Sequence, residues 1–267
     1  MPKLSLSQAW EEANVVLARD GRLFVAVALG LFVLPGLILS VSMPVAEAGK
    51  LPPAGAWVAV AIAVTLIWTV FQLAVLRLAM EPHVSVGEAI VHGGKRLLPY
   101  IAAMLCWALP ILFIGSVLSA YLVENEANPP VAASLGLLAL TVVGTFLGVR
   151  MMPSSAVASA EHIGPIAILR RSWDLSRGNW WRLFAFLLLF VIAALCLVVA
   201  VGSVTTLLVR VFAEDAGPRS VGGLLIAIVG EVLNALLSVG FLVILARIYT
   251  QLSGRAAAQP SVPSSGT

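Results

Sequence analysis

Six long stretches that are almost free of charged residues constrain this chain more than any other feature of its sequence. They cover residues 23–46, 51–76, 97–123, 127–149, 183–209 and 220–246, and only Glu231 interrupts the last of them. Each is longer than the roughly 20 apolar residues that a helix needs to cross the hydrocarbon core of a bilayer. With 60% hydrophobic and 11% charged residues, the composition is also far from that of a soluble domain. The sequence therefore predicts an all-α, polytopic membrane bundle of six transmembrane helices, and it excludes a soluble fold and a single-span anchor.

Lysine and arginine residues are divided unequally between the two sets of loops that six spans create. Thirteen of the sixteen belong to the set that contains both termini, and only Lys50, Arg210 and Arg219 belong to the other set. Because basic loops are retained in the cytoplasm, we expect a multi-pass protein of the bacterial inner membrane with both termini cytoplasmic. This topology and the anionic lipid headgroups explain the basic side, so no nucleic-acid partner is expected.

The chain is expected to form one integral membrane domain over residues 1–252. The tripeptide at 46–48 imitates a signal-peptidase site, but the acidic residues 11, 12 and 20 and the length of the first apolar stretch favour an uncleaved span. Residues 253–267 are small, polar and include proline, which predicts a disordered cytoplasmic tail.

A short segment with mixed charges and an apolar stripe precedes the first, third and fifth spans. These segments, residues 6–18, 86–95 and 165–176, are predicted to be amphipathic helices in the membrane interface. Ser5 with Gln8 and Ser85 with Glu88 match capping boxes, and Gly93-Gly94 is expected to end the second helix. The pattern suggests a threefold repeat of interfacial helix plus helical hairpin, with units of about 5–80, 85–160 and 164–250. The alternative to a repeat is that any cytoplasmic loop before a span is basic and amphipathic, so that the three segments resemble one another for that reason alone.

Residues 161–183, EHIGPIAILRRSWDLSRGNWWRL, carry the most distinctive local motif of the chain. This stretch resembles the signature of the six-helix membrane domain named after glycerophosphoryl diester phosphodiesterases, and a weaker resemblance extends over roughly residues 5–250. The resemblance implies a fold and a bacterial inner-membrane location. It implies no activity, because no loop of this chain is large enough to hold the catalytic domain that gives the family its name.

Catalytic and cofactor motifs are missing from the sequence. Serines 154, 155, 159 and 172 lie near Glu161 and His162, but small residues at a helix end and a polar turn explain them without chemistry. The histidines and the two cysteines lack metal-ligand spacing. We therefore expect neither an enzyme nor a bound cofactor.

A basic and aromatic cluster surrounds the start of the fifth span. Arginines fork onto phosphate oxygens and tryptophans favour the headgroup level, so the cluster could hold an anionic lipid or phosphate ligand. Ordinary interfacial anchoring uses the same residue types and is the alternative. The candidate headgroup residues are Arg170, Arg171, Trp173, Arg177, Trp180, Trp181 and Arg182.

Polar residues inside the apolar stretches are the second group of candidates. Glu231 lies near mid-bilayer by helical rise, Asn234 follows on the same helix face, and Gln72 is comparably deep in the second span. Arg150 could pair with Glu231, but it lies roughly 12 Å below it unless the register shifts. An embedded carboxyl must be protonated, paired or hydrated, which fits either a polar packing contact or a transport or relay site.

Two function classes follow from these residues. The leading hypothesis is a non-catalytic protein that organises lipids or partner proteins through its basic, Trp-rich cytoplasmic face. The alternative is a small transporter or channel that uses the embedded polar residues. An intramembrane lipid enzyme is the weakest option, because no nucleophile and base stand together.

Overall fold

Helices make up most of the described length of the protein. The computed structural model describes residues 4–44, 53, 55–125, 128, 130–212 and 220–254, and these contain no strand. Six helical stretches are long and apolar enough to cross a membrane, which confirms the predicted all-α class and the number of spans. The elements are α1 Leu6–Ala28, the π-helix η1 Leu29–Val33, α2 Leu34–Ser42, α3 Ala56–Met80, α4 Val86–Glu124, α5 Val131–Met151, α6 Ser154–Ala160, α7 Pro165–Ser176, α8 Trp180–Phe212 and α9 Val221–Leu252.

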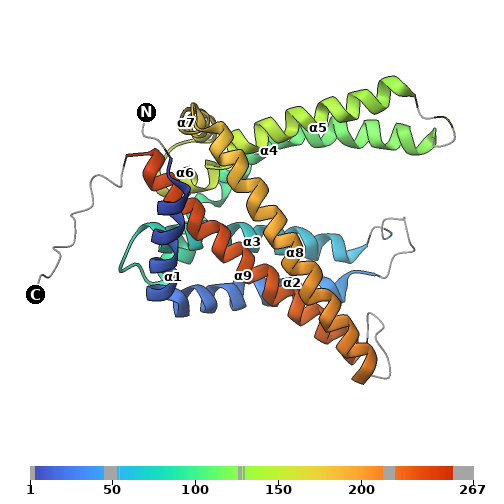
Figure 1. The fold of residues 1–267 in the computed structure, drawn as a ribbon, viewed down its shortest axis with the longest axis horizontal. Coiled ribbons are helices and arrows are strands. Elements are labelled where there is room, and N and C mark those ends of the chain that lie inside the picture. Colours follow the sequence, from blue (N-terminus) through green and yellow to red (C-terminus); the bar gives the residue numbers. More distant parts are fainter. Residues whose placement is uncertain are drawn as a thin grey trace, which may run out of the picture.

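One end of the bundle gathers the start of α1, the end of α9 and the short helices α6 and α7 (Figure 1). The backbone N–H of Ser5 donates to Gln251 Oε1 over 3.2 Å, and that of Leu4 donates to Asn179 Oδ1 over 3.4 Å. Arg182 Nη1 in turn donates to the Leu4 carbonyl over 2.7 Å. These bonds tie the first turn of the chain to the α7–α8 connection and to the last turn of α9.

Of the three segments expected in the interface, α7 is a separate helix that matches the predicted bounds of 165–176. The view of Figure 1 runs almost along its axis, whereas α8 lies across the view, so α7 runs crosswise to the spans. Residues 6–18 and 86–95 are also helical, but they are the first turns of α1 and α4 and not separate elements.

The prediction that Gly93-Gly94 ends a helix is wrong, because α4 continues through both glycines to Glu124. A Cβ on Gly93 would lie 2.9 Å from the carbonyl oxygen of Val70 in α3, so the glycine permits close contact between the two helices. Packing against α3 therefore outweighs the low helix propensity of the glycine pair.

Prolines lie within or beside three of the spans, and two of them coincide with irregular points of the helix. Pro110 lies inside α4, Pro153 separates α5 from α6, and Pro35 follows the π-helix η1. The π-helix shifts the hydrogen-bond register immediately before a residue that has no N–H to donate. The first span is thus irregular at its centre.

The hydrophobic core lies where α3, α6 and α9 meet, and the α4–α5 hairpin diverges from it (Figure 1). Phe71, Leu73, Leu76, Ile248 and Tyr249 are among its fully buried side chains. By contrast, no residue in the most apolar part of the fourth span is buried inside the molecule. A hollow bounded by α3, α4, α8 and α9 lies beside this core, and its lining is described below.

Candidate functional site

A buried polar cluster that the sequence analysis did not single out surrounds the short helix α6. The Arg96 guanidinium, from α4, donates to the carbonyls of Ala158, Glu161 and Ile163 over 2.8, 2.6 and 2.9 Å. His92, one helical turn earlier, contacts the Ser159 carbonyl over 2.8 Å. Both side chains therefore satisfy backbone oxygens that the end of α6 leaves without helical partners.

Glu161 connects this cluster to two further helices. Its carboxylate accepts a hydrogen bond from the Tyr249 hydroxyl of α9 over 2.8 Å and pairs with Arg171 Nε of α7 over 3.1 Å. The α4 arginine and the α7–α9 contacts thus converge on the connection between α6 and α7. Because every charged group in this cluster has a partner, its role is to join helices. The sequence contains no signal for it, since the acceptors of Arg96 are backbone carbonyls.

The serines near Glu161 and His162 are occupied by structural hydrogen bonds. Ser159 Oγ donates to the Leu73 carbonyl over 3.0 Å and Ser172 Oγ donates to the Arg150 carbonyl over 3.0 Å. Ser154 and Ser155 face the buried hydroxyl of Tyr100, and Gln72 reaches the same hydroxyl. This arrangement favours the interpretation of the serines as packing residues over that of nucleophiles.

The basic and aromatic candidates lie on α7 and the first turns of α8, but they are not equivalent. Arg171 is committed to Glu161 and Arg182 to the Leu4 carbonyl. Arg170 and Arg177 are exposed and form no hydrogen bond or ion pair with another described residue, and Trp181 keeps 74% of its surface exposed. The members of the cluster that remain available to a ligand are therefore Arg170, Arg177 and Trp181. This surface is here called the α7 face.

Arg150 belongs with this cluster and not with Glu231. Its guanidinium carbon lies 4.7 Å from the centre of the Trp173 ring and 5.3 Å from that of Phe146. Trp180 stacks against Phe146 and Phe184 beside it, with ring centres 5.6 and 5.2 Å apart. The cation–π contact joins α5 to α7, and the contact between Phe146 and Trp180 adds α8. No register shift brings Arg150 to Glu231, so the two do not pair.

Glu231 is placed against the first span. A Cβ on Gly36 of α2 would lie 2.6 Å from the Glu231 Cδ, so the carboxyl rests on the bare backbone of that glycine. It forms no hydrogen bond or ion pair with another described residue. The small residue that allows this approach is therefore Gly36, whereas Gly230, the neighbour of Glu231 in α9, has open space around it.

Gln72 and Asn234 lie together on the lining of the hollow between the spans, whereas Glu231 and Arg150 lie elsewhere. This hollow, of about 680 Å³, is bounded by α3, α4, α8 and α9 and by Phe32 of η1. Eighteen residues line it, and none of them is charged. The four embedded candidates therefore do not form a continuous proton or ion relay in the described part of the chain.

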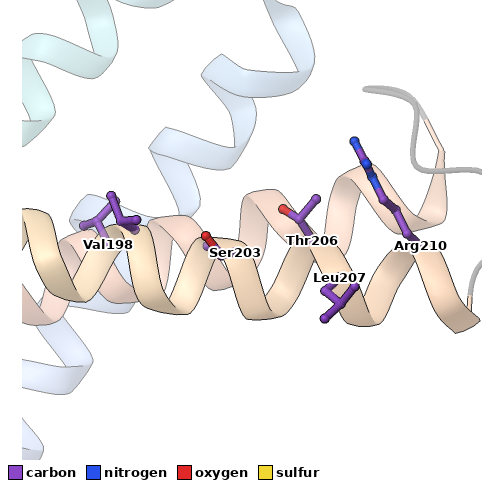
Figure 2. A pocket seen from close by; sticks show the side chains of 7 residues that line it. Val198, Ser203, Thr206, Leu207 and Arg210 are labelled. Carbon is purple, nitrogen blue, oxygen red and sulfur yellow. The ribbon is translucent and has the colours of Figure 1, made fainter.

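A second hollow of about 510 Å³ runs along the exposed surface of α8 (Figure 2). Ser203, Thr206 and Arg210 follow one another along this helix. Arg210 lies in the last turn of α8, whereas Trp180, Trp181 and Arg182 lie in its first turn. All residues that line the hollow belong to α8. With one wall described, it is a surface depression and not an enclosed site.

Among the described residues, no group of three or more His, Cys, Asp and Glu side chains could hold a metal ion. Six long apolar helices, with a polar cluster at one end and an uncharged hollow between the spans, define a multi-pass helical membrane protein. The chain belongs to the family described as the domain of unknown function DUF7847, whose model matches residues 4–252. No curated protein and no solved structure matches it. The relationship to the phosphodiesterase membrane domain stays a prediction.

The contact between Glu231 and Gly36 gives a direct test of how the carboxyl contributes. Replacing Gly36 by Ala should displace the carboxyl and lower the free energy of unfolding by about 1 kcal/mol, the low end of the cost of overpacking, because the end of the Glu231 side chain can move aside. In a Glu231→Ala background, the same change should cost much less, because the opposing atoms are gone. Unfolding by sodium dodecyl sulfate in mixed micelles measures both. Equal costs in the two backgrounds would show that Gly36 does not act through Glu231.

Proposed function

We propose that this protein is a non-catalytic bacterial inner-membrane protein that organises anionic lipids through the basic, Trp-rich face formed by α7 and the start of α8. The observation that carries the proposal is that Arg170 and Arg177 are exposed and bind no other described residue. They lie on α7 and directly after its last residue, respectively, and α7 runs crosswise to the spans (Figure 1). A helix in this orientation can lie in the plane of the headgroups. Guanidinium groups bind phosphate oxygens in pairs of parallel hydrogen bonds.

The apolar residues of the same face support this placement. Ile166 is 64% exposed and Trp181 is 74% exposed, although both are large hydrophobic side chains. Tryptophan favours the boundary between headgroups and hydrocarbon, and an exposed isoleucine is favourable where lipid covers it. The first turns of α1 and α4 are proposed to lie at the same level, as the other two members of a threefold repeat.

The orientation of this face toward the cytoplasm is part of the proposal. It is supported by the division of Lys and Arg, thirteen against three, between the two sets of loops. The cytoplasmic leaflet is also the one that carries a negative surface potential. Basic residues at this end would therefore meet anionic phosphate groups, and no enzyme activity is needed to explain them.

The test compares the association of spin-labelled phosphatidylglycerol and phosphatidylcholine with the protein in phosphatidylcholine bilayers. Two arginines that contribute about 1 kcal/mol each would produce a preference for the anionic lipid of up to about 30-fold. The double replacement Arg170→Gln and Arg177→Gln should therefore reduce this preference by several-fold. High salt should weaken the preference of the parent protein, because exposed charges are screened.

Arg210→Gln is the matched control, because Arg210 is an exposed arginine at the opposite end of α8. It should leave the preference of the α7 face nearly unchanged. Lipid preference that persists in the double variant, or that falls equally in the Arg210 variant, would contradict a role for the α7 face. Arg171 and Arg182 are unsuitable for this test, since their replacement also breaks bonds that join helices.

A further inference from the structure

The hollow of about 680 Å³ between the spans, here called the lateral groove, lies within the part of the molecule that a bilayer would surround. Its volume is within the range of ligand-binding pockets. Along α8 it extends from Leu187 to Val198, eleven residues or roughly 16 Å of helix. That length is about half of a hydrocarbon core of roughly 30 Å. The groove thus has the size and depth to hold one long-chain molecule.

Most of the lining is apolar and aromatic, and α3 contributes Thr65, Thr69 and Gln72, of which the two threonine hydroxyls donate to backbone carbonyls of their own helix. From α9 come two further polar side chains, Asn234 and Ser238, that are one helical turn apart. Neither forms a hydrogen bond with another described residue, and Asn234 is exposed. An amide or hydroxyl that faces hydrocarbon without a partner costs free energy. These two groups therefore favour an occupant that carries its own hydrogen-bonding atoms at this depth.

The opposite wall is fixed by an irregular backbone. Trp68 Nε1 donates to the Phe32 carbonyl within the π-helix over 3.1 Å, and the Trp68 ring stacks on the Phe32 ring with centres 5.1 Å apart. Phe71 packs against Phe32 at 5.2 Å. Single-turn π-helices recur at functional sites. Here the π-helix positions an aromatic wall that faces the groove.

The absence of charged residues from the lining restricts the class of ligand. An ionised group in a desolvated groove would require a partner of opposite charge, and none of the eighteen lining residues supplies one. An ordinary phospholipid carries its ester carbonyls and charged headgroup near the interface. Asn234 lies deeper, thirteen residues or roughly 20 Å of helix from the start of α9.

We propose that the lateral groove binds a neutral long-chain amphiphile whose hydroxyl or carbonyl group is recognised by Asn234 and Ser238. The alkyl chain lies along the α8 wall and the aromatic wall of η1 and α3. The Asn234 amide both donates and accepts, so it can bind either a hydroxyl or a carbonyl. This site is separate from the anionic-lipid face, because it lies between the spans and contains no basic residue.

The test uses hexadecanol that carries a diazirine, with the protein in nanodiscs of phosphatidylcholine alone. After illumination, adducts should concentrate on groove residues such as Leu195 and Phe241, and excess unlabelled hexadecanol should compete for them. A diazirine-bearing hexadecane, which lacks the hydroxyl, should label the same residues several-fold less. Because these membranes contain no anionic lipid, the result is independent of the proposed function of the α7 face.

Two variants locate the contacts. Asn234→Leu removes the amide from an exposed position and should lower labelling of the groove by about fivefold, while leaving the protein folded. Leu195→Trp should block the groove, whereas Leu189→Trp is the matched control, because Leu189 is an exposed residue of the same helix outside the lining. The melting temperature of each variant confirms that it is folded.

Three results would overturn the proposal. The first is labelling of Leu195 that no competitor reduces and that equals labelling of Leu189, since this would mean contact with bulk lipid. The second is equal labelling by the alcohol and the alkane, since then no polar group is recognised. The third is unchanged labelling in the Asn234→Leu variant, since this would show that Asn234 does not recognise the ligand. This result does not depend on whether the Leu195→Trp variant folds.

Discussion

Replacing Arg96 by alanine is expected to destabilise the protein more than any other single substitution at its charged residues. The side chain is 8% exposed and satisfies three backbone carbonyls around the end of α6. Hydrogen bonds that involve a charged group contribute about 1.5–3 kcal/mol each, and buried acceptors left without a partner incur a desolvation cost. We therefore expect a loss of about 3 kcal/mol or more in the free energy of unfolding. Thermal unfolding in detergent measures this loss as a fall in melting temperature.

Two further variants separate the hydrogen bonds from the charge. Arg96→Lys keeps the charge but cannot reproduce the forked geometry of the guanidinium, so it should recover only part of the loss. Lys95→Ala removes the neighbouring, exposed basic residue and should have little effect on stability. If Arg96→Ala and Lys95→Ala behaved alike, the three bonds would not be important for the α4–α6 contact.

The importance of Arg96 illustrates what the sequence can and cannot predict. Spans were predictable because the distance across a bilayer is fixed and charges are excluded from it. In the sequence, however, Arg96 is one of two basic residues at a span entry, and it resembles an ordinary topology determinant. Its partners are backbone carbonyls 62 to 67 residues away. Backbone acceptors have no residue type, so no pattern of side chains could indicate them.

The embedded candidates show the same limit. Helical rise correctly placed Arg150 too far from Glu231 for a pair, but it could not show that Arg150 stacks on Trp173 of α7. Asn234 and Gln72 were identified because polar residues are rare in apolar stretches. That they line one groove follows from the packing of α3 against α9, two helices that are distant in sequence.

The second large effect is expected at Gly93. A Cβ there would lie 2.9 Å from the Val70 carbonyl oxygen and 3.3 Å from the Val70 Cγ1, and a backbone atom cannot move aside as the end of a side chain can. Gly93→Ala should therefore separate α4 from α3 and cost about 1–3 kcal/mol in the free energy of unfolding. Unfolding by sodium dodecyl sulfate in mixed micelles would detect this as an earlier transition.

The adjacent glycine provides the control for this prediction. Gly94 is exposed in the same helix, and a Cβ on it would meet no atom within 4 Å. Gly94→Ala should therefore stabilise the protein by up to about 1 kcal/mol, because alanine loses less backbone entropy in a helix. Opposite signs at two neighbouring glycines can arise only from the contact with α3, since helix propensity is the same for both. If both substitutions stabilised the protein, the two helices would not be held together at Gly93, and the continuity of α4 would need another cause.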